Sequence, residues 1–185
     1  MRVLFIGGTG AISRACTELA VERGIELWHL NRGQRDWKAP KGVKQIKADV
    51  RKPKELTVAL KGKTFDSVVD WICYTPEQAK LDLEVFAGKT GQFVFISSAS
   101  AYEKPPSHYL ITESTPLKNP YWEYSRNKIA CEELLTLAWR DQGFPITIVR
   151  PSYTYYTGVT PTALGGWDYT IVERIRKKRP VIVHG

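Results

Sequence analysis

The sequence lacks any long apolar run. No stretch among its 185 residues reaches the roughly 18 consecutive apolar positions that a membrane-spanning helix needs. The amino terminus does not resemble a signal peptide, because Met1 and Arg2 lead through the short run Val3 to Ile6 directly into a glycine-rich turn. Both absences argue against a membrane protein and predict a cytoplasmic one.

Cysteine is scarce as well. The three cysteines, Cys16, Cys73 and Cys131, are odd in number, far apart and set among apolar residues, and none belongs to a Cys-x-x-Cys pair. This pattern predicts reduced, buried thiols and argues against a disulfide framework, a redox pair or a zinc site. We therefore expect no metal.

Acidic residues are too few to balance the basic ones, and the formal net charge is +8. Such an excess fits a nucleic-acid surface, a pocket for phosphate-bearing ligands or a solvated basic face. The densest basic run, Arg174 to Arg179, has helical character and no interleaved aromatic residue. Because RNA recognition needs exposed aromatics within a basic face, nucleic acid is not the expected partner.

What the sequence does contain is an alternation of short apolar runs and helix-length segments. Runs rich in Val, Ile and Phe occupy residues 2–7, 25–30, 43–47, 67–72, 93–97 and 146–150. Short continuous apolar strands are typical of a parallel sheet that is covered on both faces. The alternation predicts an α/β fold with a doubly wound parallel sheet, the Rossmann fold.

Helices are expected between several of these runs. Pro53 and Pro76 stand where the first turn of a helix accepts proline, and the longest expected helix covers residues 121–140. Apolar spacing predicts the buried face of the first helix as Ile12, Ala15, Cys16, Leu19 and Ala20. The same reasoning gives the buried face of the longest helix as Ile129, Leu134, Leu137 and Ala138.

A glycine-rich turn joins the first run to the first helix. Its spacing is Gly7-x-x-Gly10-x-x-Ser13, with serine at the position where glycine is usual. In a strand-turn-helix unit, the missing side chains let a pyrophosphate approach the N-terminus of the helix. We expect a dinucleotide to contact Gly7, Thr9, Gly10, Ala11 and Ile12. An ordinary tight turn that feeds a helix is the alternative.

The second run ends without the carboxylate that NAD-preferring proteins place on the ribose. The chain reads Leu30-Asn31-Arg32-Gly33. A guanidinium at Arg32 can pair with the 2′-phosphate of NADP, and Asn31 does not repel that phosphate as Asp would. NADP is therefore slightly favoured over NAD. A solvated turn arginine is the other interpretation of Arg32.

Tyr124 and Lys128 are four residues apart near the start of the longest expected helix, which puts both on one helix face. An ammonium group beside a phenol stabilises the phenolate and lowers the pKa of the tyrosine. The run at 93–97 ends in Ser97-Ser98-Ala99-Ser100, which places small hydroxyl groups at the carboxyl end of the sheet, where α/β proteins bind ligands.

The glycine turn, the serine run and the Tyr-x-x-x-Lys pair together resemble the short-chain dehydrogenase/reductase superfamily. The resemblance covers essentially the whole chain and points to the extended NAD-dependent epimerase/dehydratase family and its atypical relatives. It implies that Ser98, Tyr124 and Lys128 are the catalytic residues. Tyr124 would be the acid/base, Ser98 would hold the substrate oxygen, and Lys128 would also hold the nicotinamide ribose.

The same resemblance places further residues beside the cofactor. Asp49 and Val50 would lie near the adenine ring, and Pro151 would lie along the nicotinamide side. The chain departs from the family where Tyr155-Tyr156-Thr157-Gly158 replaces the usual Tyr-Gly-Pro-Gly. Trp71 and Tyr74 are also bulkier than usual after the fourth strand, and each either lines a substrate pocket or packs in the core.

The activity implied by the resemblance is hydride transfer between NAD(P) and a carbon that bears a hydroxyl or carbonyl group. The protein would be an epimerase, a dehydratase or a reductase that acts on a small molecule, with a nucleotide sugar as one candidate. A homodimer is frequent in the family. The alternative is a non-catalytic NAD(P)-sensing or RNA-binding protein on the same fold, although such regulators commonly lose the catalytic tyrosine.

We expect residues 1–158 to form the NAD(P)-binding Rossmann domain. Residues 159–185 would begin a substrate-binding region. Family members normally continue well past this point, so the C-terminal substrate domain is expected to be truncated in this chain.

Overall fold

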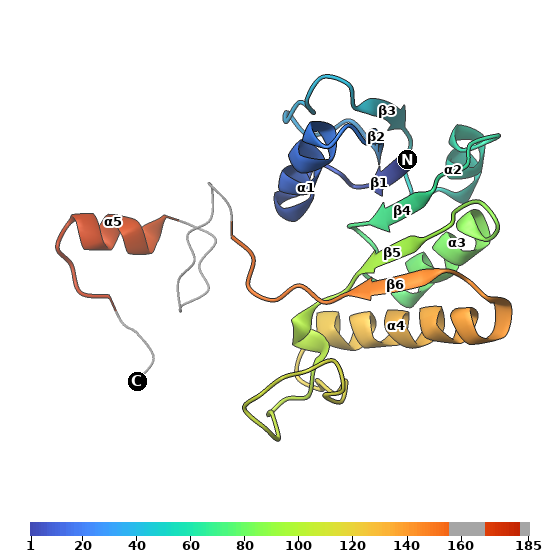
Figure 1. The fold of residues 1–185 in the computed structure, drawn as a ribbon. Helices are drawn as coiled ribbons and strands as arrows, with labels where there is room; N and C mark the ends of the chain where they lie inside the picture. The colour runs from blue at the N-terminus through green and yellow to red at the C-terminus, as the bar shows by residue number, and fades with distance from the viewer. Residues whose placement is uncertain (156–168, 182–185) are drawn as a thin grey trace. The chain divides into compact units, whose positions relative to one another are not determined.

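The computed structural model describes residues 1–155 and 169–181, which belong to two compact units, Met1–Ser152 and Tyr153–Gly185 (Figure 1). The domain boundary expected at residue 158 lies outside the described residues, as do Tyr156, Thr157 and Gly158. In the second unit the structure describes one helix, α5 (Thr170–Arg176).

The first unit is built on a six-stranded sheet whose strands follow the order β3-β2-β1-β4-β5-β6. Its strands are β1 (Arg2–Ile6), β2 (Glu26–Asn31), β3 (Lys44–Lys47), β4 (Ser67–Asp70), β5 (Phe93–Ile96) and β6 (Ile146–Val149). All neighbouring strands are parallel. The chain moves outward from β1 to β3 and then returns to β4 beside β1, which confirms the doubly wound Rossmann fold. Ligands of such sheets bind where the strand order reverses, at the carboxyl ends of β1 and β4.

Helices cross between the strands where the sequence predicts them. They are α1 (Ala11–Glu22), α2 (Pro53–Ala59), α3 (Pro76–Phe86), α4 (Glu123–Gln142) and the short 3₁₀ helix η1 (Ala99–Ala101). Pro53 and Pro76 each occupy the first turn of their helix, where a missing N–H costs nothing. Gly143 ends α4 in the left-handed conformation, with φ of 69°.

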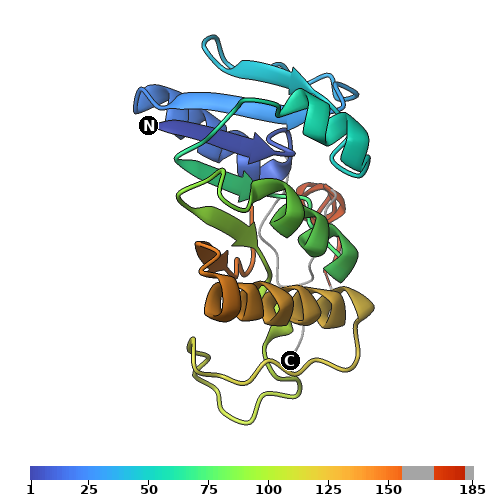
Figure 2. The same ribbon diagram turned by 90° about the vertical axis from the view of Figure 1, so that its right-hand side faces the viewer.

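The two faces of the sheet are covered unequally. Figure 2 shows α2, α3 and α4 in front of the strands and α1 behind them. A large core under α2, α3 and α4 includes Leu4, Ile6, Phe93 and Leu135, whereas the core beside α1 is a small cluster around Phe5. Apolar burial therefore fixes the first face more strongly than the second.

Two helices bury different faces from those that the apolar spacing predicts. Helix α1 buries Ser13, Thr17 and Ala20, while Leu19 is 45% exposed. Helix α4 buries Ser125, Lys128, Cys131, Glu132, Leu135 and Ala138, while Leu137 is 54% exposed. The predicted faces were wrong at these positions because polar side chains with specific partners take the buried places.

Two cations of the basic helix in the second unit have local hydrogen-bond partners. The Lys177 ammonium lies 2.6 Å from a carboxylate oxygen of Glu173, and Arg174 donates to the carbonyl of Pro180. Such contacts fit a solvated basic face better than a nucleic-acid surface. None of the helices in the described part of the chain is long and apolar enough to span a membrane.

Candidate active site

The glycine turn leaves no room for side chains at its first two positions. Gly7 has φ of 81°, and a Cβ atom there would lie 2.6 Å from Cγ2 of Ile72. A Cβ atom on Gly8 would lie 2.6 Å from Nε2 of His29, whose ring is fully buried below the turn. Both glycines are therefore required by the packing of the protein itself.

Gly10 differs from these two glycines. A Cβ atom at this position would meet only Oγ of Ser13, at 3.4 Å, so the protein does not need the side chain to be absent. Gly10 is the N-cap of α1, where unpaired backbone N–H groups and the helix dipole attract an anion. An open helix N-terminus preceded by glycine fits the pyrophosphate of a dinucleotide, beside Thr9, Ala11 and Ile12.

Ser13 replaces the usual third glycine and closes the turn. Its Oγ accepts a hydrogen bond from the Gly10 N–H at 2.8 Å and donates toward the Gly7 carbonyl at 3.2 Å. The side chain is buried, so it fills the place where helix and strand approach each other. The substitution therefore preserves the turn.

His29 supports the turn from below as a neutral ring. Its Nε2 lies 3.0 Å from Oγ1 of Thr17, and its ring stacks on Phe5 with 5.9 Å between centroids. Burial lowers the pKa of His29 to about 4. The imidazole is therefore uncharged at neutral pH, and it adds no positive charge under the expected pyrophosphate.

The end of β2 carries the residues expected to select the cofactor. The Oδ1 atom of Asn31 accepts a hydrogen bond from the Gly33 N–H at 2.9 Å, which fixes the turn after the strand. Arg32 is exposed. Two arginines that sequence reasoning missed, Arg14 and Arg35, both donate to the carbonyl of Thr9, at 3.2 and 3.3 Å. For Arg35, its closeness to Arg32 in the sequence was a signal that could have identified it.

The residues expected near the adenine ring follow β3. Oδ1 of Asp49 accepts a hydrogen bond from the Arg51 N–H at 3.0 Å, and Val50 packs against the larger core. Ala48 donates from its N–H to the carbonyl of Asn31 at 3.1 Å, so this segment lies next to the end of β2. An adenine position beside Asp49 and Val50 stays a prediction.

The three expected catalytic residues come together at the carboxyl ends of β4 and β5. Nζ of Lys128 donates to the carbonyls of Cys73 and Ile96, at 2.6 and 2.7 Å, and lies 5.6 Å from the ring centroid of Tyr124. Ser98 lies near enough to Tyr124 for its hydroxyl to lower the pKa of the phenol. The i, i+4 spacing on α4 therefore does place the phenol and the ammonium on one face.

The electrostatics of this group differ from the sequence expectation. Burial raises the pKa of Tyr124 above its ordinary value, and the Ser98 hydroxyl offsets only part of that rise. Burial also lowers the pKa of Lys128. The Lys128 ammonium directs two of its donors to backbone carbonyls, and the pKa of Tyr124 is raised where the sequence predicts a lowering.

A chain of hydroxyl groups holds Ser98. Oγ of Ser125 donates to Oγ of Ser100 at 2.9 Å, and Oγ of Ser100 donates to Oγ of Ser98 at 2.9 Å. Nδ2 of Asn119 anchors the chain by donating to the Ser100 carbonyl at 2.7 Å. Sequence reasoning missed this chain, although Ser100 and Ser125 lie inside the two motifs that it identified.

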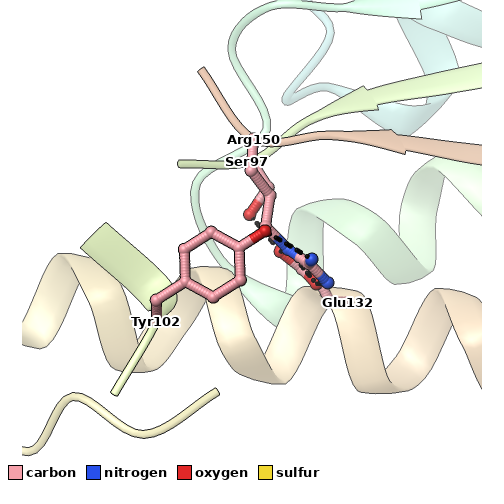
Figure 3. Close-up of polar contacts among 4 residues, drawn as sticks. All are labelled: Ser97, Tyr102, Glu132 and Arg150. Carbon is pink, nitrogen blue, oxygen red and sulfur yellow. Dashed lines mark hydrogen bonds and ion pairs between the residues drawn. The ribbon is translucent and has the colours of Figure 1, made fainter. Parts of the chain in front are cut away.

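A largely buried ion pair fixes the scaffold next to the candidate catalytic group (Figure 3). The guanidinium of Arg150, at the end of β6, contacts Glu132 of α4 through Nη2 at 2.6 Å and through Nε at 3.0 and 3.1 Å. Nη1 of Arg150 donates to the hydroxyl of Tyr102 at 3.1 Å, and Ser97 donates to Glu132. These contacts join β5, β6, η1 and α4.

Pro151 extends this junction. Its carbonyl accepts a hydrogen bond from the Ala99 N–H at 2.9 Å, which ties the segment after β6 to the residue that follows Ser98. The position is compatible with the expected wall beside the nicotinamide.

The two bulky aromatics after β4 have different surroundings. Trp71 packs edge-on against Phe5, with 5.3 Å between ring centroids, and belongs to the smaller core. Tyr74 is 39% exposed and lies 6.3 Å from the ring of Tyr124, whose other neighbour is Trp122 at 4.8 Å. Trp71 is thus a core residue, while Tyr74 and Trp122 flank the candidate catalytic tyrosine.

A parallel Rossmann sheet with a glycine turn before α1 and a Ser, Tyr, Lys group at the strand ends defines a protein of the extended short-chain dehydrogenase/reductase type. Residues 3–185 match the NAD dependent epimerase/dehydratase family, and the chain belongs to that family. Among curated proteins it is similar to 2′-dehydrokanamycin reductase of Streptomyces kanamyceticus, with 27% identity over 85% of this chain and 44% of the relative.

Solved structures show the same fold. The UDP-glucose 4-epimerase of Thermus thermophilus, in complex with NAD, matches with a TM-score of 0.74 and 24% identity over 98% of this chain and 64% of that one. The enzyme WbmG of Bordetella bronchiseptica, in complex with NAD, matches with a TM-score of 0.78 and 16% identity over 98% and 61%. The chain thus spans less than half of the curated relative and less than two thirds of these structures.

Proposed function

We propose that the chain is the cofactor-binding and catalytic part of an NAD(P)-dependent oxidoreductase. Its substrate would carry a hydroxyl or carbonyl carbon, and a nucleotide sugar is the candidate that the UDP-glucose epimerases among the structural neighbours favour. The observation that carries the proposal is the meeting of Ser98, Tyr124 and Lys128 at the strand ends. A bound nicotinamide would supply or accept the hydride at its C4 atom.

Each catalytic residue then has a role at a stated atom. The hydroxyl of Tyr124 exchanges a proton with the substrate oxygen, and the Ser98 hydroxyl donates a hydrogen bond to the same oxygen while charge develops on it. The remaining donor of the Lys128 ammonium is available to the ribose hydroxyls, because its other two hydrogen bonds go to the carbonyls of Cys73 and Ile96.

A neutral Tyr124 phenol is the proton donor that reduction of a carbonyl group requires. Because burial raises its pKa, the phenol is neutral at physiological pH and can donate a proton to a carbonyl oxygen. The similarity to a reductase agrees with the reductive direction. Reduction of a keto group is therefore the first reaction to test, and epimerisation or dehydration would use the same residues.

The exposed rings of Tyr74 and Trp122 support a substrate with a ring beside Tyr124. Both rings lie next to the ring of Tyr124, and both remain partly open to solvent. Aromatic faces pack well against the apolar C–H surface of hydroxylated rings, while the hydroxyl groups remain free for hydrogen bonds. This arrangement fits the sugar part of a nucleotide sugar.

NADP is favoured over NAD because three arginines are available near the end of β2. Arg32 is exposed, and Arg14 and Arg35 already converge on Thr9 in the glycine turn. A guanidinium is suited to a phosphate because it offers parallel donors. We also propose, as separate predictions, a domain boundary at residue 158 and a homodimer.

The cofactor proposal is tested by titrating the folded chain with NADPH and with NADH while nicotinamide fluorescence is followed. Arg32→Ala and Arg35→Ala should each weaken NADPH binding by about 10-fold or more, the value of a charged hydrogen bond, and leave NADH binding unchanged. Arg23→Ala, at the opposite end of α1, is the matched control and should affect neither cofactor.

Two results would contradict the proposal. Equal losses for NADPH and NADH in the Arg32 and Arg35 variants would remove the phosphate-recognition argument. Failure of the folded wild-type chain to bind either cofactor would favour a degenerate scaffold that no longer binds NAD(P) and overturn the proposed activity.

A further inference from the structure

Two buried carboxyl groups lie behind the catalytic lysine. Asp70 ends β4, Asp82 lies on α3, each is 2% exposed, and a carboxylate oxygen of one lies within 4.8 Å of a carboxylate oxygen of the other. Two adjacent buried carboxylates repel each other and lose hydration, so one of them keeps its proton at neutral pH. The assigned mechanism does not use this pair.

The partners of the two carboxyls indicate which one carries the charge. Oδ1 of Asp70 accepts a hydrogen bond from the Ile72 N–H at 2.6 Å, and the Cys73 N–H provides a second donor. Oδ2 of Asp82 has no partner among the described residues. Backbone donors stabilise an anion at Asp70, so Asp82 is the protonated member.

The charged partner is linked to Lys128 through a short turn. The hydrogen bonds that Asp70 accepts fix the turn to Cys73, whose carbonyl accepts from Nζ of Lys128 at 2.6 Å. Lys128 itself is 1% exposed, and an ammonium so deeply buried needs a compensating negative charge to stay protonated. The geometry makes Asp70 the candidate for that charge.

Other ionisable groups around the ammonium are less suited to supply it. They are Cys73 and Tyr74 in the turn, and Tyr124, Cys131 and Glu132 on α4. A hydrogen bond to the Cys131 thiol and burial raise the pKa of Cys73, and burial raises that of both tyrosines. The hydrogen bond with Cys73 and the charge of Lys128 lower the pKa of Cys131, but a thiol is a weaker acid than a carboxyl group. Glu132 is already paired with Arg150.

We propose that Asp70 and Asp82 share one proton and act as a positioning pair that holds Lys128 in place and keeps it charged under Tyr124. The inference rests on the proposed function for its catalytic meaning. The ligand atoms of Asp70, Cys73 and Asp82 also lie within 4.8 Å of one another, a spacing that a metal ion could use. The Lys128 ammonium already provides positive charge there, so a proton fits the cluster better than a metal.

The shared proton is tested directly by infrared spectroscopy on the chain without cofactor. At neutral pH the wild-type protein should show the carbonyl band of a protonated carboxyl group, and Asp82→Asn should remove that band. Glu84→Gln on the exposed face of α3 is the matched control and should retain it. Absence of the band in the folded wild-type protein, or a stoichiometric metal in the purified protein, would overturn the shared proton.

The effect on Lys128 is tested by the pH dependence of NADPH binding, which should weaken at alkaline pH as the ammonium loses its proton. The double variant Asp70→Asn/Asp82→Asn removes the negative charge and should move this alkaline limit down by about 1 pH unit or more. Asp82→Asn alone should move it much less, because an amide at position 82 still donates to Asp70 and leaves the single charge in place.

The outcomes separate the two proposals. An unchanged alkaline limit in the folded double variant would overturn the positioning role while the cofactor proposal stands. A carboxyl band in a wild-type chain that binds no nicotinamide would leave the shared proton intact and remove both the cofactor proposal and the role of the pair toward Lys128. A fall in affinity equal at all pH values would indicate a purely structural effect and also count against the positioning role.

Discussion

The two halves of the candidate site are built by opposite means. In the cofactor half, between β1 and β3, the turn depends on missing side chains at Gly7 and Gly8, above a neutral imidazole. In the catalytic half, around β5, β6 and α4, buried charges are held in place by several partners each, as in the contacts of Arg150 with Glu132 and Tyr102. The first half is determined by shape and the second by paired polar atoms.

This difference predicts how each half fails. Added volume or added charge should damage the cofactor half, where the backbone must approach a ligand. Removal of a partner atom should damage the catalytic half, because a buried charge or donor is then left unpaired.

The largest effect is expected from Glu132→Ala. The change leaves the guanidinium of Arg150 without its carboxylate, and breaking a buried pair costs about 3–5 kcal/mol. Because the Arg150 side chain is 19% exposed and keeps its contact with Tyr102, the loss should lie at the lower end of that range. Urea unfolding followed by circular dichroism measures the loss. Glu133→Ala, at the exposed neighbouring position, is the control and should cost little. Similar losses in the two variants would contradict the assigned role of the pair.

The second largest effect on stability is expected at acidic pH, where His29 in the cofactor half becomes protonated. The pKa of His29 falls from about 6.5 unfolded to about 4 folded, so the unfolded chain binds more protons between these values. Stability is therefore complete above pH 6.5 and is lost as pH falls toward 4, by about 1.4 kcal/mol per pH unit and about 3 kcal/mol in total.

His29→Gln should remove this part of the pH dependence, measured as the difference in unfolding free energy between wild type and variant from pH 7 to about 4. His108→Gln is the matched control, because it removes a histidine that is exposed in the loop before α4 and lies outside the core. A parallel pH dependence in wild type and His29→Gln would show that the buried ring is not the group responsible.

A smaller effect should separate two glycines of the same turn. Gly8→Ala forces a methyl group to 2.6 Å from the buried His29 ring and should cost about 1–3 kcal/mol of stability. Gly10→Ala should leave stability nearly unchanged and weaken NADPH binding, because its methyl group has room in the protein but covers the helix N-terminus. Thermal unfolding and cofactor titration of both variants give the comparison, and a Gly10→Ala protein that binds normally would remove the pyrophosphate from this position.

The sequence predicts the backbone of this site well, because strand and helix positions depend on local patterns. The apolar runs at 2–7 and 93–97 become β1 and β5 within two residues, and Pro53 and Pro76 begin their helices as expected. The glycine turn and the Tyr124–Lys128 spacing are also local, so their placement follows from the sequence alone.

The polar interior could not be predicted in this way. Ser13, Thr17, Lys128 and Glu132 face inward, where apolar periodicity predicts Leu19 and Leu137. Each of these polar groups is stabilised by a partner outside its own helix, such as Arg150 for Glu132 or Cys73 for Lys128. Spacing along one helix contains no information about such partners.

The smallest effect is expected from Ser125→Ala in the catalytic half. The variant removes the hydroxyl that donates to Ser100, which in turn donates to Ser98, and it should cost about 1 kcal/mol of stability. Since Ser100 is then free to rotate away from Ser98, turnover of a keto substrate should fall more than cofactor binding does. Ser107→Ala, in the exposed loop, is the control for both measurements. Equal turnover in the two variants would show that Ser98 is held by the N-cap of η1 alone, and the catalytic half would then depend less on linked polar atoms than the structure indicates.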